Sequence, residues 1–326
     1  MIYVETGSED VFFNFGLEYY FASEKELPEP IFLFWRTTPT LMVGKYQNTL
    51  EEINRAYAES HDIAVVRRLS GGGTIYTDRG GWQYTFITRG DAGAIEFHQY
   101  LAPVLDALHA LGADAVFTGR NDLLVDGKKI SGTAQYKLPG VTVHHGSLLF
   151  DTDFEQMMAA THVSAEKFSS KSIKSVRERV TNLAEHLPQV TSPEDFKEKM
   201  VSAILRGGAR YTLTAEDIAA AERIADERFR PWSCRYGADP KCTYSRAARF
   251  AGGRVQVQLD LQKGTIRSAQ LSGDFFASEQ LEALKAALCG CVYEKEAVSA
   301  VLSRFENVIY GVTQDELLTL FFPEGE

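Results

Sequence analysis

A glycine-rich segment between two apolar runs carries the first sign of chemistry in this sequence. It reads Arg67-Arg68-Leu69-Ser70-Gly71-Gly72-Gly73-Thr74-Ile75-Tyr76-Thr77-Asp78. Glycine reaches positive φ at little cost and lets the backbone approach a ligand closely. Successive N–H groups in such a turn form a concavity that binds anions. Because two arginines stand at its entrance, we expect an anion site here, with a flexible hairpin loop as the alternative.

This segment matches neither of the two common phosphate-binding loops. A Walker A loop ends in Gly-Lys-Ser/Thr, and a dinucleotide-binding fingerprint opens a helix. Here the three glycines are followed by Thr74-Ile75-Tyr76, which does not begin a helix. The apolar run at residues 63–66 and the alternating run at residues 82–88 are typical of strands. We therefore expect the glycines to connect two strands.

A second dense segment, residues 119–135, holds further polar groups. Asp126-Gly127 between two apolar runs indicates a tight hairpin. Lys129 would open the returning strand, and Gly132 within that strand suggests a close backbone approach. Together with Asn121 and Asp122, the lysine could converge with the glycine loop on one phosphate-rich ligand.

Two other stretches are ambiguous by themselves. His144 and His145 are adjacent on an expected strand, so they face opposite sides and cannot easily bind one metal ion together. Residues 171–183 are basic and rich in hydroxyl groups. Most such charged runs are exposed loops, although this one could also serve the same anionic ligand.

Composition narrows the class of protein. The net charge is −10, which argues against nucleic acid as a partner, so an anionic ligand needs a local basic site. The cysteines, Cys234, Cys242, Cys289 and Cys291, contain no CxxC pair, and we expect them to be reduced and non-catalytic in a cytoplasmic protein. The N-terminus has no signal-peptide pattern, and we expect no membrane-spanning segment.

The expected elements define an α+β fold with a mixed, mostly antiparallel sheet and packed helices, followed by a small α+β C-terminal domain. Residues 10–23 predict a helix in which Asn14 and Glu18 are surface or capping groups. Residues 31–36 and 41–45 predict a strand pair, and residues 51–60 a helix. A linker punctuated by proline and glycine predicts a boundary between a large first domain, residues 1–245, and a small C-terminal domain, residues 246–326, which the resemblance described below makes a catalytic and an accessory domain.

Five motifs in this order closely resemble the lipoate–protein ligases. They are Arg-Arg-x-Ser-Gly-Gly-Gly at 67–73, Gly-Arg-Asn-Asp-Leu at 119–123, Lys-[Val/Ile]-Ser-Gly at 129–132, His-His-Gly-[Ser/Thr]-Leu-Leu at 144–149 and Ser-Val-Arg-x-Arg-Val-Thr-Asn-Leu at 175–183. The resemblance covers nearly the whole chain. It implies the biotinyl/lipoyl ligase fold and a cytoplasmic, monomeric enzyme that uses ATP and Mg²⁺.

The resemblance also implies a two-step reaction and a set of roles. Lipoate would attack ATP to give lipoyl-AMP, which a lysine of an acceptor would then attack. Acceptors would be lipoyl domains of 2-oxoacid dehydrogenase complexes and the glycine cleavage H protein. Lys129 would be the catalytic residue. Lipoate would contact Arg68, Ser70, Gly71, Gly72, Gly73 and Thr77; the nucleotide would contact Asn121, Asp122, Lys129, Ser175, Arg177, Arg179 and Asn182; and Asp122 would bind Mg²⁺.

Two alternatives and one departure remain. An ATP-independent lipoyl or octanoyl transferase shares this fold but uses a cysteine in the loop after the His-His-Gly strand, and residues 161–169 contain none. A non-catalytic acyl- or nucleotide-binding relative is the other alternative, and Lys129 argues against it. The departure is that Thr77 and Gly81 stand where many family members have histidine and asparagine. We expect an altered preference between lipoate and octanoate, unless the change is lineage drift in a loop.

Overall fold

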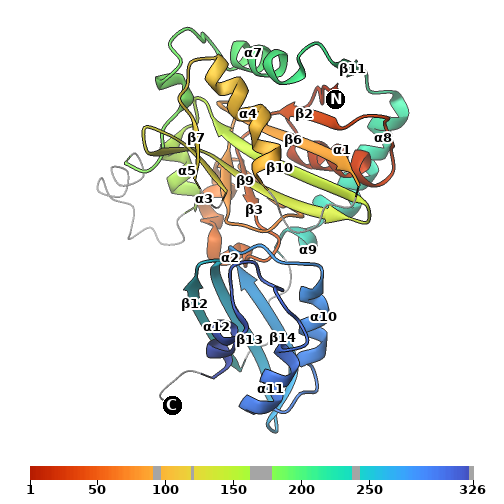
Figure 1. Cartoon of the computed structure of the whole chain (residues 1–326), viewed down its shortest axis with the longest axis vertical. Coiled ribbons are helices and arrows are strands. Elements are labelled where there is room, and N and C mark those ends of the chain that lie inside the picture. Colours follow the sequence, from red (N-terminus) through yellow and green to blue (C-terminus); the bar gives the residue numbers. More distant parts are fainter. Residues whose placement is uncertain (91–96, 119–120, 162–177, 237–242, 323–326) are drawn as a thin grey trace. The chain divides into compact units, whose positions relative to one another are not determined.

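The computed structural model describes residues 1–90, 97–118, 121–161, 178–236 and 243–322 (Figure 1). The chain forms two compact units. The first comprises Met1–Met42, Leu50–Arg68 and Ile75–Arg235, and the second comprises Val43–Thr49, Leu69–Thr74 and Tyr236–Glu326. Two short segments from the first part of the chain, Val43–Thr49 and Leu69–Thr74, thus belong to the second unit. A single boundary along the sequence does not describe this division.

The first unit is built on an eight-stranded sheet of order β11-β1-β2-β6-β10-β9-β8-β7. Its strands are β1 (Ile2–Val4), β2 (Ile31–Trp35), β6 (Gly81–Arg89), β7 (Val116–Thr118), β8 (Asp122–Val125), β9 (Lys128–Leu138), β10 (Val141–Leu149) and β11 (Ala209–Tyr211). Strand β1 runs parallel to both of its neighbours, β11 and β2. Every other neighbouring pair in this sheet, from β2–β6 at one end to β8–β7 at the other, is antiparallel. The predicted α+β class with a mixed, mostly antiparallel sheet is confirmed.

Alternation along the central strands separates two faces of this sheet. Trp82, Tyr84 and Phe86 of β6 point into the main core, where they meet α4 (His98–Ala110) and α7 (Pro193–Leu205). Helix α4 crosses in front of the central strands in Figure 1. The predicted start of α7 is confirmed, since the Ser192 side chain accepts a hydrogen bond from the N–H of Asp195 and proline occupies the first turn.

Helix α1 (Val11–Ser23) packs on the opposite face, and α8 (Ala215–Ile224) and the π-helical turn η3 (Ala225–Phe229) pack on α1, with α9 (Trp232–Arg235) against η3. The expectation that Asn14 and Glu18 are surface or capping groups was wrong, because their exposed fractions are 0% and 1%. Helix α1 lies between the sheet and α8, so more than one side of it is buried. Amphipathic spacing cannot reveal a helix that is covered on two sides.

A separate three-stranded sheet of order β4-β3-β5 contains β3 (Thr40–Val43), β4 (Ala64–Arg67) and β5 (Ile75–Thr77). The expected pairing of residues 31–36 with residues 41–45 was wrong, because β2 pairs with β1 and β6. Two short helices, α2 (Thr49–Glu52) and α3 (Arg55–Ser60), replace the single helix expected at residues 51–60. Both strands were predicted, but strand partners depend on contacts distant in sequence.

The second unit contains a meander of β12 (Tyr244–Phe250), β13 (Gly253–Gln262) and β14 (Thr265–Gly273). Helices α10 (Gln280–Leu288), α11 (Lys295–Leu302) and α12 (Gln314–Phe321) supply the rest of its core, which includes Val257, Leu284 and Phe321. The predicted Lys263-Gly264 turn is confirmed by φ values of 51° and 73°. This unit therefore has a hydrophobic core of its own.

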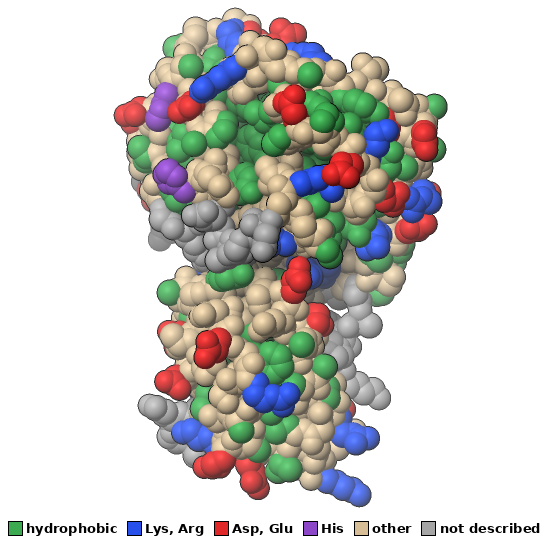
Figure 2. All heavy atoms as spheres, turned by 45° about the vertical axis from the view of Figure 1, so that its right-hand side comes forward, with side chains coloured by type: hydrophobic (Ala, Val, Ile, Leu, Met, Phe, Trp, Pro, Cys, Tyr) green, Lys and Arg blue, Asp and Glu red, His purple; other side chains and the backbone are tan. Residues whose placement is uncertain are grey.

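The surface is of mixed charge on the face drawn in Figure 2, where described acidic and basic side chains are interspersed. None of the helices in the described parts of the chain is both long and apolar enough to span a bilayer.

Candidate active site

Lys129 is placed by the hairpin between β8 and β9. Asp126 and Gly127 both have positive φ, 50° and 74°, so the predicted tight turn is confirmed. The ammonium Nζ of Lys129 lies 2.7 Å from Oδ1 of Asp122. A Cβ added at Gly132 would lie 3.1 Å from the same Nζ. The glycine therefore leaves the room in which the lysine side chain lies, as its place in the strand suggested.

Asn121 and Asp122 take different positions at the start of β8. The Asn121 side-chain amide donates to the carbonyl of Thr133, whose N–H donates to the Asn121 carbonyl. Asn121 therefore ties β8 to β9. The Asp122 carboxylate is one-third exposed and pairs with Lys129, whose side chain is exposed to a similar extent. The structure thus brings Lys129, Asp122 and Asn121 together where β8 and β9 pair.

The end of the basic stretch runs beside Lys129. The N–H of Lys129 donates to the carbonyl of Arg179, and the N–H of Thr181 donates to the carbonyl of Lys129. Asn182 follows directly and lies close to Thr152. Ser175 and Arg177 lie outside the described residues, so their predicted roles stay predictions.

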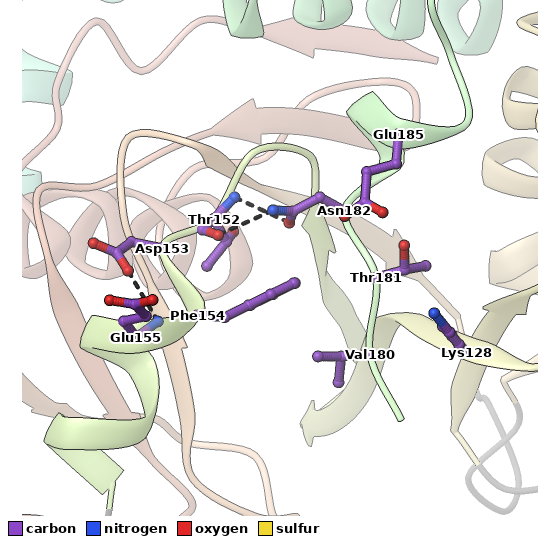
Figure 3. Close-up of a pocket in the computed structure, with 9 residues that line it drawn as sticks. All are labelled: Lys128, Thr152, Asp153, Phe154, Glu155, Val180, Thr181, Asn182 and Glu185. Carbon is purple, nitrogen blue, oxygen red and sulfur yellow. Dashed lines mark hydrogen bonds between the residues drawn. The ribbon is translucent and has the colours of Figure 1, made fainter. Parts of the chain in front are cut away.

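A cavity of about 500 Å³ opens beside this segment (Figure 3). Its walls come from the start of β9, from the residues after β10 and from the segment that runs from the end of the basic stretch into the short helix η2 (Leu183–Glu185). They are Lys128, Thr152, Asp153, Phe154, Glu155, Val180, Thr181, Asn182 and Glu185. Asp153, Phe154 and Glu155 mark the start of α5 (Phe154–Thr161), and Glu185 ends η2. The lining is mainly polar and includes three carboxylates and one ammonium group, so it suits a neutral polar ligand better than an anion.

The glycine loop belongs to the second unit. The N–H of Gly72 donates to the carbonyl of Phe275, and the carbonyl of Ser70 accepts from the N–H of Lys45. Gly72 has a φ of 93°, which favours glycine. Ser70 is buried, with an exposed fraction of 1%. The glycines thus let this loop lie against the backbone of its own unit, a use that the sequence did not predict.

Arg68 and Thr77 are both buried in the first unit. Arg68 donates to the carbonyl of Met42 at 2.7 Å. Burial, followed by the nearby charge of Arg67, lowers the pKa of Arg68 to about 10, so its guanidinium stays cationic at neutral pH. The Thr77 hydroxyl accepts a 2.7 Å hydrogen bond from the side-chain amide of Gln83. Gln83 therefore supplies a polar group next to Thr77, the position where we expect histidine in many family members.

A buried polar network on the α1 face was missed by the sequence interpretation. The Glu18 carboxylate accepts from Thr85 Oγ1 at 2.8 Å and from the Tyr136 hydroxyl at 3.2 Å. His145 Nδ1 lies 3.1 Å from the same carboxylate. Burial, followed by the charge of Glu18, raises the pKa of Tyr136, which therefore keeps its proton for this hydrogen bond. The sequence signal for the burial of Glu18 was the presence of this charged residue within a helix rich in aromatic side chains.

His144 faces the other side of the sheet, as the alternation along a strand predicted. Its ring stacks on Tyr100 of α4, with ring centroids 4.9 Å apart, and its Nε2 lies 2.8 Å from Thr133 Oγ1. Burial, followed by the nearby His145, lowers the pKa of His144 to about 3. His144 is thus a neutral core residue, and the two histidines do not face a common ligand.

Comparison with known proteins agrees with the fold and the motifs. Residues 10–205 match the family described as the lipoyl protein ligase A/B catalytic domain. Residues 239–321 match the bacterial lipoate protein ligase C-terminus. The first match spans more than half of the chain and contains Lys129, Asp122 and Asn182. The chain belongs to the lipoate–protein ligase family, and it is an enzyme of that family.

Relatives of similar length support this assignment. Lipoate–protein ligase 1 of Staphylococcus aureus is 36% identical over 312 residues, covering 94% of this chain and 95% of that protein. Lipoate-protein ligase LplJ of Bacillus subtilis is 35% identical over 317 residues, covering 95% of this chain and 96% of that protein. The predicted family is therefore confirmed over nearly the full chain.

Solved structures share the fold. P. falciparum LipL1 in complex with lipoate has a TM-score of 0.80 at 20% identity, covering 97% of this chain and 96% of that chain. A bi-partite lipoate protein ligase from Thermoplasma acidophilum, described with its E2 lipoyl domain, has a TM-score of 0.65 at 25% identity, covering 74% and 98%. A lipoate-protein ligase A bound with ATP has a TM-score of 0.61 at 22% identity, covering 72% and 97%.

Proposed function

We propose that this enzyme activates lipoate with ATP and transfers the lipoyl group to a lysine of an acceptor protein. In the first step a lipoate carboxylate oxygen bonds to the α-phosphorus of ATP, and the bond to the β-phosphate oxygen breaks to release pyrophosphate. In the second step the acceptor amine attacks the lipoyl carbonyl, AMP leaves, and the amine loses a proton as the amide forms. The chemical work is positioning and stabilisation of charge at phosphorus.

The observation that carries this proposal is the position of Lys129. Its ammonium is partly exposed, is held 2.7 Å from Asp122 and lies over a glycine. An ammonium group offers three donors to carboxylate and phosphate oxygens. Val180, whose backbone pairs with that of Lys129, lines the cavity. Lys129 would therefore stabilise the charge that develops between the lipoate carboxylate and the α-phosphate.

The nucleoside part of ATP would lie against the acidic wall of the cavity, which Asp153, Glu155 and Glu185 form. The carboxylates of Asp153, Glu155 and Glu185 can accept hydrogen bonds from ribose hydroxyls and from the adenine amino group. The same carboxylates repel phosphate oxygens, so the triphosphate would extend away from them. A solved structure with the same fold contains ATP, which supports the proposal that this chain uses it too.

Mg²⁺ is the metal that the reaction implies. Within the described residues no group of three or more His, Cys, Asp or Glu side chains could hold a metal ion. Mg²⁺ in phosphoryl-transfer sites commonly needs one or two carboxylates, with phosphate oxygens and water as further ligands. The one-third-exposed carboxylate of Asp122 fits that requirement. Asp122 would hold Mg²⁺, whose charge would offset that of the phosphate oxygens.

The remaining roles rest on the family resemblance. We propose that lipoate contacts Arg68, Ser70, Gly71, Gly72, Gly73 and Thr77, and that Ser175, Arg177 and Arg179 contact the nucleotide. Acceptors would be lipoyl domains of 2-oxoacid dehydrogenase complexes and the glycine cleavage H protein, with the enzyme acting as a monomer in the cytoplasm. The archaeal relative described with its E2 lipoyl domain supports an acceptor of this kind.

A direct experiment tests the function. The purified protein is assayed for exchange of labelled pyrophosphate into ATP, with and without lipoate, and then for mass increase of an apo lipoyl domain. We expect exchange that depends on lipoate and a product heavier by one lipoyl group. Lipoylation from a lipoylated donor domain without ATP would instead support a transferase. Nucleotide binding without either reaction would support a non-catalytic relative.

A cysteine-free variant separates the ligase from the thioester route. Cys234 and Cys291 are partly exposed, Cys289 is exposed, and Cys242 lies outside the described residues. Burial raises the pKa of Cys291, which disfavours its nucleophilic thiolate. We expect the variant with all four cysteines replaced by serine to keep lipoate-dependent ligation within about twofold of wild type. Loss of ligation in a variant with an unchanged circular dichroism spectrum would favour a cysteine nucleophile.

Replacement of Thr77 tests the predicted acyl preference. Thr77 is tightly surrounded, since Gln83 donates to its hydroxyl and a Cβ added at Gly81 would lie 3.3 Å from it. A histidine would displace Gln83, so we expect Thr77→His to change the lipoate-to-octanoate ratio of kcat/KM by about 3- to 10-fold. The KM for ATP should change less than twofold. Thr77→Ser keeps the hydroxyl and serves as the control. An unchanged ratio in the histidine variant would show that this position does not shape the acyl site.

A further inference from the structure

The main chain of Lys129 is held by the end of the basic stretch. On one side Lys129 pairs with Leu124 of β8. On the other side the described register between β9 and β10 ends at Thr133 and Gly146. Val180 forms a parallel bridge with Lys129 on that free edge, through the 2.8 Å and 3.1 Å hydrogen bonds to Arg179 and Thr181. The segment thus acts as an extra strand at the residue proposed for catalysis.

Asn182 fixes this segment to the chain that follows β10. Its Oδ1 accepts from the N–H of Thr152 at 3.0 Å, and its Nδ2 donates to the carbonyl of Thr152 at 3.0 Å (Figure 3). The side-chain amide therefore satisfies both backbone groups of one residue, as a neighbouring strand would. Exposed fractions are 9% for Asn182 and 4% for Thr152. A further hydrogen bond, from the N–H of Ala184 to the carbonyl of Phe150, extends the attachment.

We propose that Asn182 is a positioning residue for Lys129 rather than a contact of the nucleotide. This inference rests on the proposed function, in which Lys129 stabilises charge during adenylation. The Asn182 amide bonds to the main chain of Thr152 through both its oxygen and its nitrogen. Asn182 stands at the end of the segment that pairs with Lys129. Loss of this attachment would weaken the pairing of Lys129 with the segment around Val180. The pairing of Lys129 with β8, within the hairpin, would remain.

Small displacements of Lys129 matter because its side chain is long and its charge acts at close range. The side chain has one described ion-pair partner, Asp122, and is one-third exposed. Its reach is therefore set largely by where its main chain lies. A misplacement of about 1 Å can cost about 10²-fold in rate. Asn182 would act on the reaction through this distance, without touching a substrate.

Asn14 provides a matched control. It is also a buried asparagine, with an exposed fraction of 0%, and its Nδ2 donates to the backbone carbonyls of Ser8 and Arg36. Both side chains therefore satisfy backbone groups in the first unit. The partners of Asn14 belong to the entry of α1 and the end of β2, and none is in the segment that pairs with Lys129. Asn14→Ala should destabilise the protein as Asn182→Ala does, without moving Lys129.

The first test combines kinetics with hydrogen exchange. For Asn182→Ala we expect kcat of lipoate-dependent pyrophosphate exchange to fall by about 30- to 100-fold, while the KM values for lipoate and ATP stay within about threefold. We also expect the amides of Lys129 and Thr181 to exchange at least about tenfold faster, because their hydrogen bonds lose support. Asn14→Ala should leave kcat within about threefold and leave these two amides unchanged.

The Asn182→Asp variant adds a signature in pH. An ionised aspartate keeps the bond from the Thr152 N–H but places a second acceptor against the Thr152 carbonyl. Burial against that carbonyl should raise the pKa of the new carboxyl. When protonated, the carboxyl can donate as the asparagine does. We therefore expect kcat relative to wild type to rise by about three- to tenfold as pH falls from about 7.5 to 5.5, with no such rise for Asn182→Ala.

Three outcomes overturn the inference. The first is an unchanged kcat and unchanged exchange of the Lys129 amide in Asn182→Ala. The second is a large rise in the KM for ATP with kcat preserved, which would make Asn182 a nucleotide contact. The third is an equal loss of kcat in Asn14→Ala at equal loss of stability. Failure of wild type to catalyse lipoate-dependent exchange would instead refute the proposed function, and hydrogen exchange would still decide whether Asn182 holds Lys129.

Discussion

Lys129→Ala is expected to lower the kcat of lipoate-dependent pyrophosphate exchange by about 10²- to 10³-fold, the largest effect of any change considered. One charged donor at a developing transition state contributes about 3–4 kcal/mol to lowering the barrier. The ammonium of Lys129 is such a donor, because it projects over Gly132 and is partly exposed beside Asp122. The fold should survive, since the side chain is partly exposed and packs on the surface of β9.

The experiment needs a charge control and a shape control. Lys137→Ala removes another partly buried lysine of the same strand and should keep the exchange rate within about twofold. Lys129→Arg keeps the positive charge but brings a wider, planar group into a space that is open only because residue 132 is glycine, so we expect it to remain impaired. Near-normal exchange by Lys129→Ala would refute the catalytic assignment.

Gly71→Ala is expected to have the largest effect on stability of the changes considered. A Cβ at this position would lie 2.3 Å from the carbonyl oxygen of Phe275, whose bond to the N–H of Gly72 holds the loop. Neither atom belongs to a flexible side chain, so the backbone itself must shift. We expect a loss of about 2–3 kcal/mol in the stability of the second unit, read by thermal unfolding. Exchange should fall by at least about tenfold.

Gly73→Ala is the matched control within the same loop. The nearest atom to a Cβ at Gly73 is Cβ of Asp274 at 3.8 Å, an ordinary contact distance. This variant should unfold within about 1 °C of wild type, and the comparison with Gly71→Ala is made on unfolding temperature alone. If the two alanine variants behaved alike, the close approach at Gly71 would not be what constrains this loop.

The departure at Thr77 and Gly81 has a structural counterpart in neighbouring residues. Gln83 places its amide 2.7 Å from the Thr77 hydroxyl, and the Thr152 hydroxyl lies 3.2 Å from where a Cβ of residue 81 would be. Both neighbours are buried. The room for larger polar side chains at 77 and 81 is thus taken by side chains from other strands and loops, so these positions depend on one another.

Much of the fold and family could be predicted from the sequence, because the signals are local. Asp126-Gly127 demands a tight turn, Ser192 and Pro193 start a helix, and Lys263-Gly264 joins two strands. These depend on backbone preferences within a few residues. The five motifs are likewise runs of adjacent residues, and their order indicated the lipoate–protein ligases, which the comparisons confirm. The catalytic assignment of Lys129 came from such a run and awaits its experiment.

Only the tertiary structure decided which distant groups meet. Glu18 was expected at the surface, yet it lies in the core, where Thr85, Tyr136 and His145 surround its carboxylate. The glycine loop packs on the carbonyl of Phe275, about 200 residues away along the chain. Asn182 reaches Thr152 and thereby holds the strand edge of Lys129. Burial and hydrogen-bond partners of this kind depend on how the strands and helices are assembled, because a residue's own sequence neighbours do not determine what packs against it.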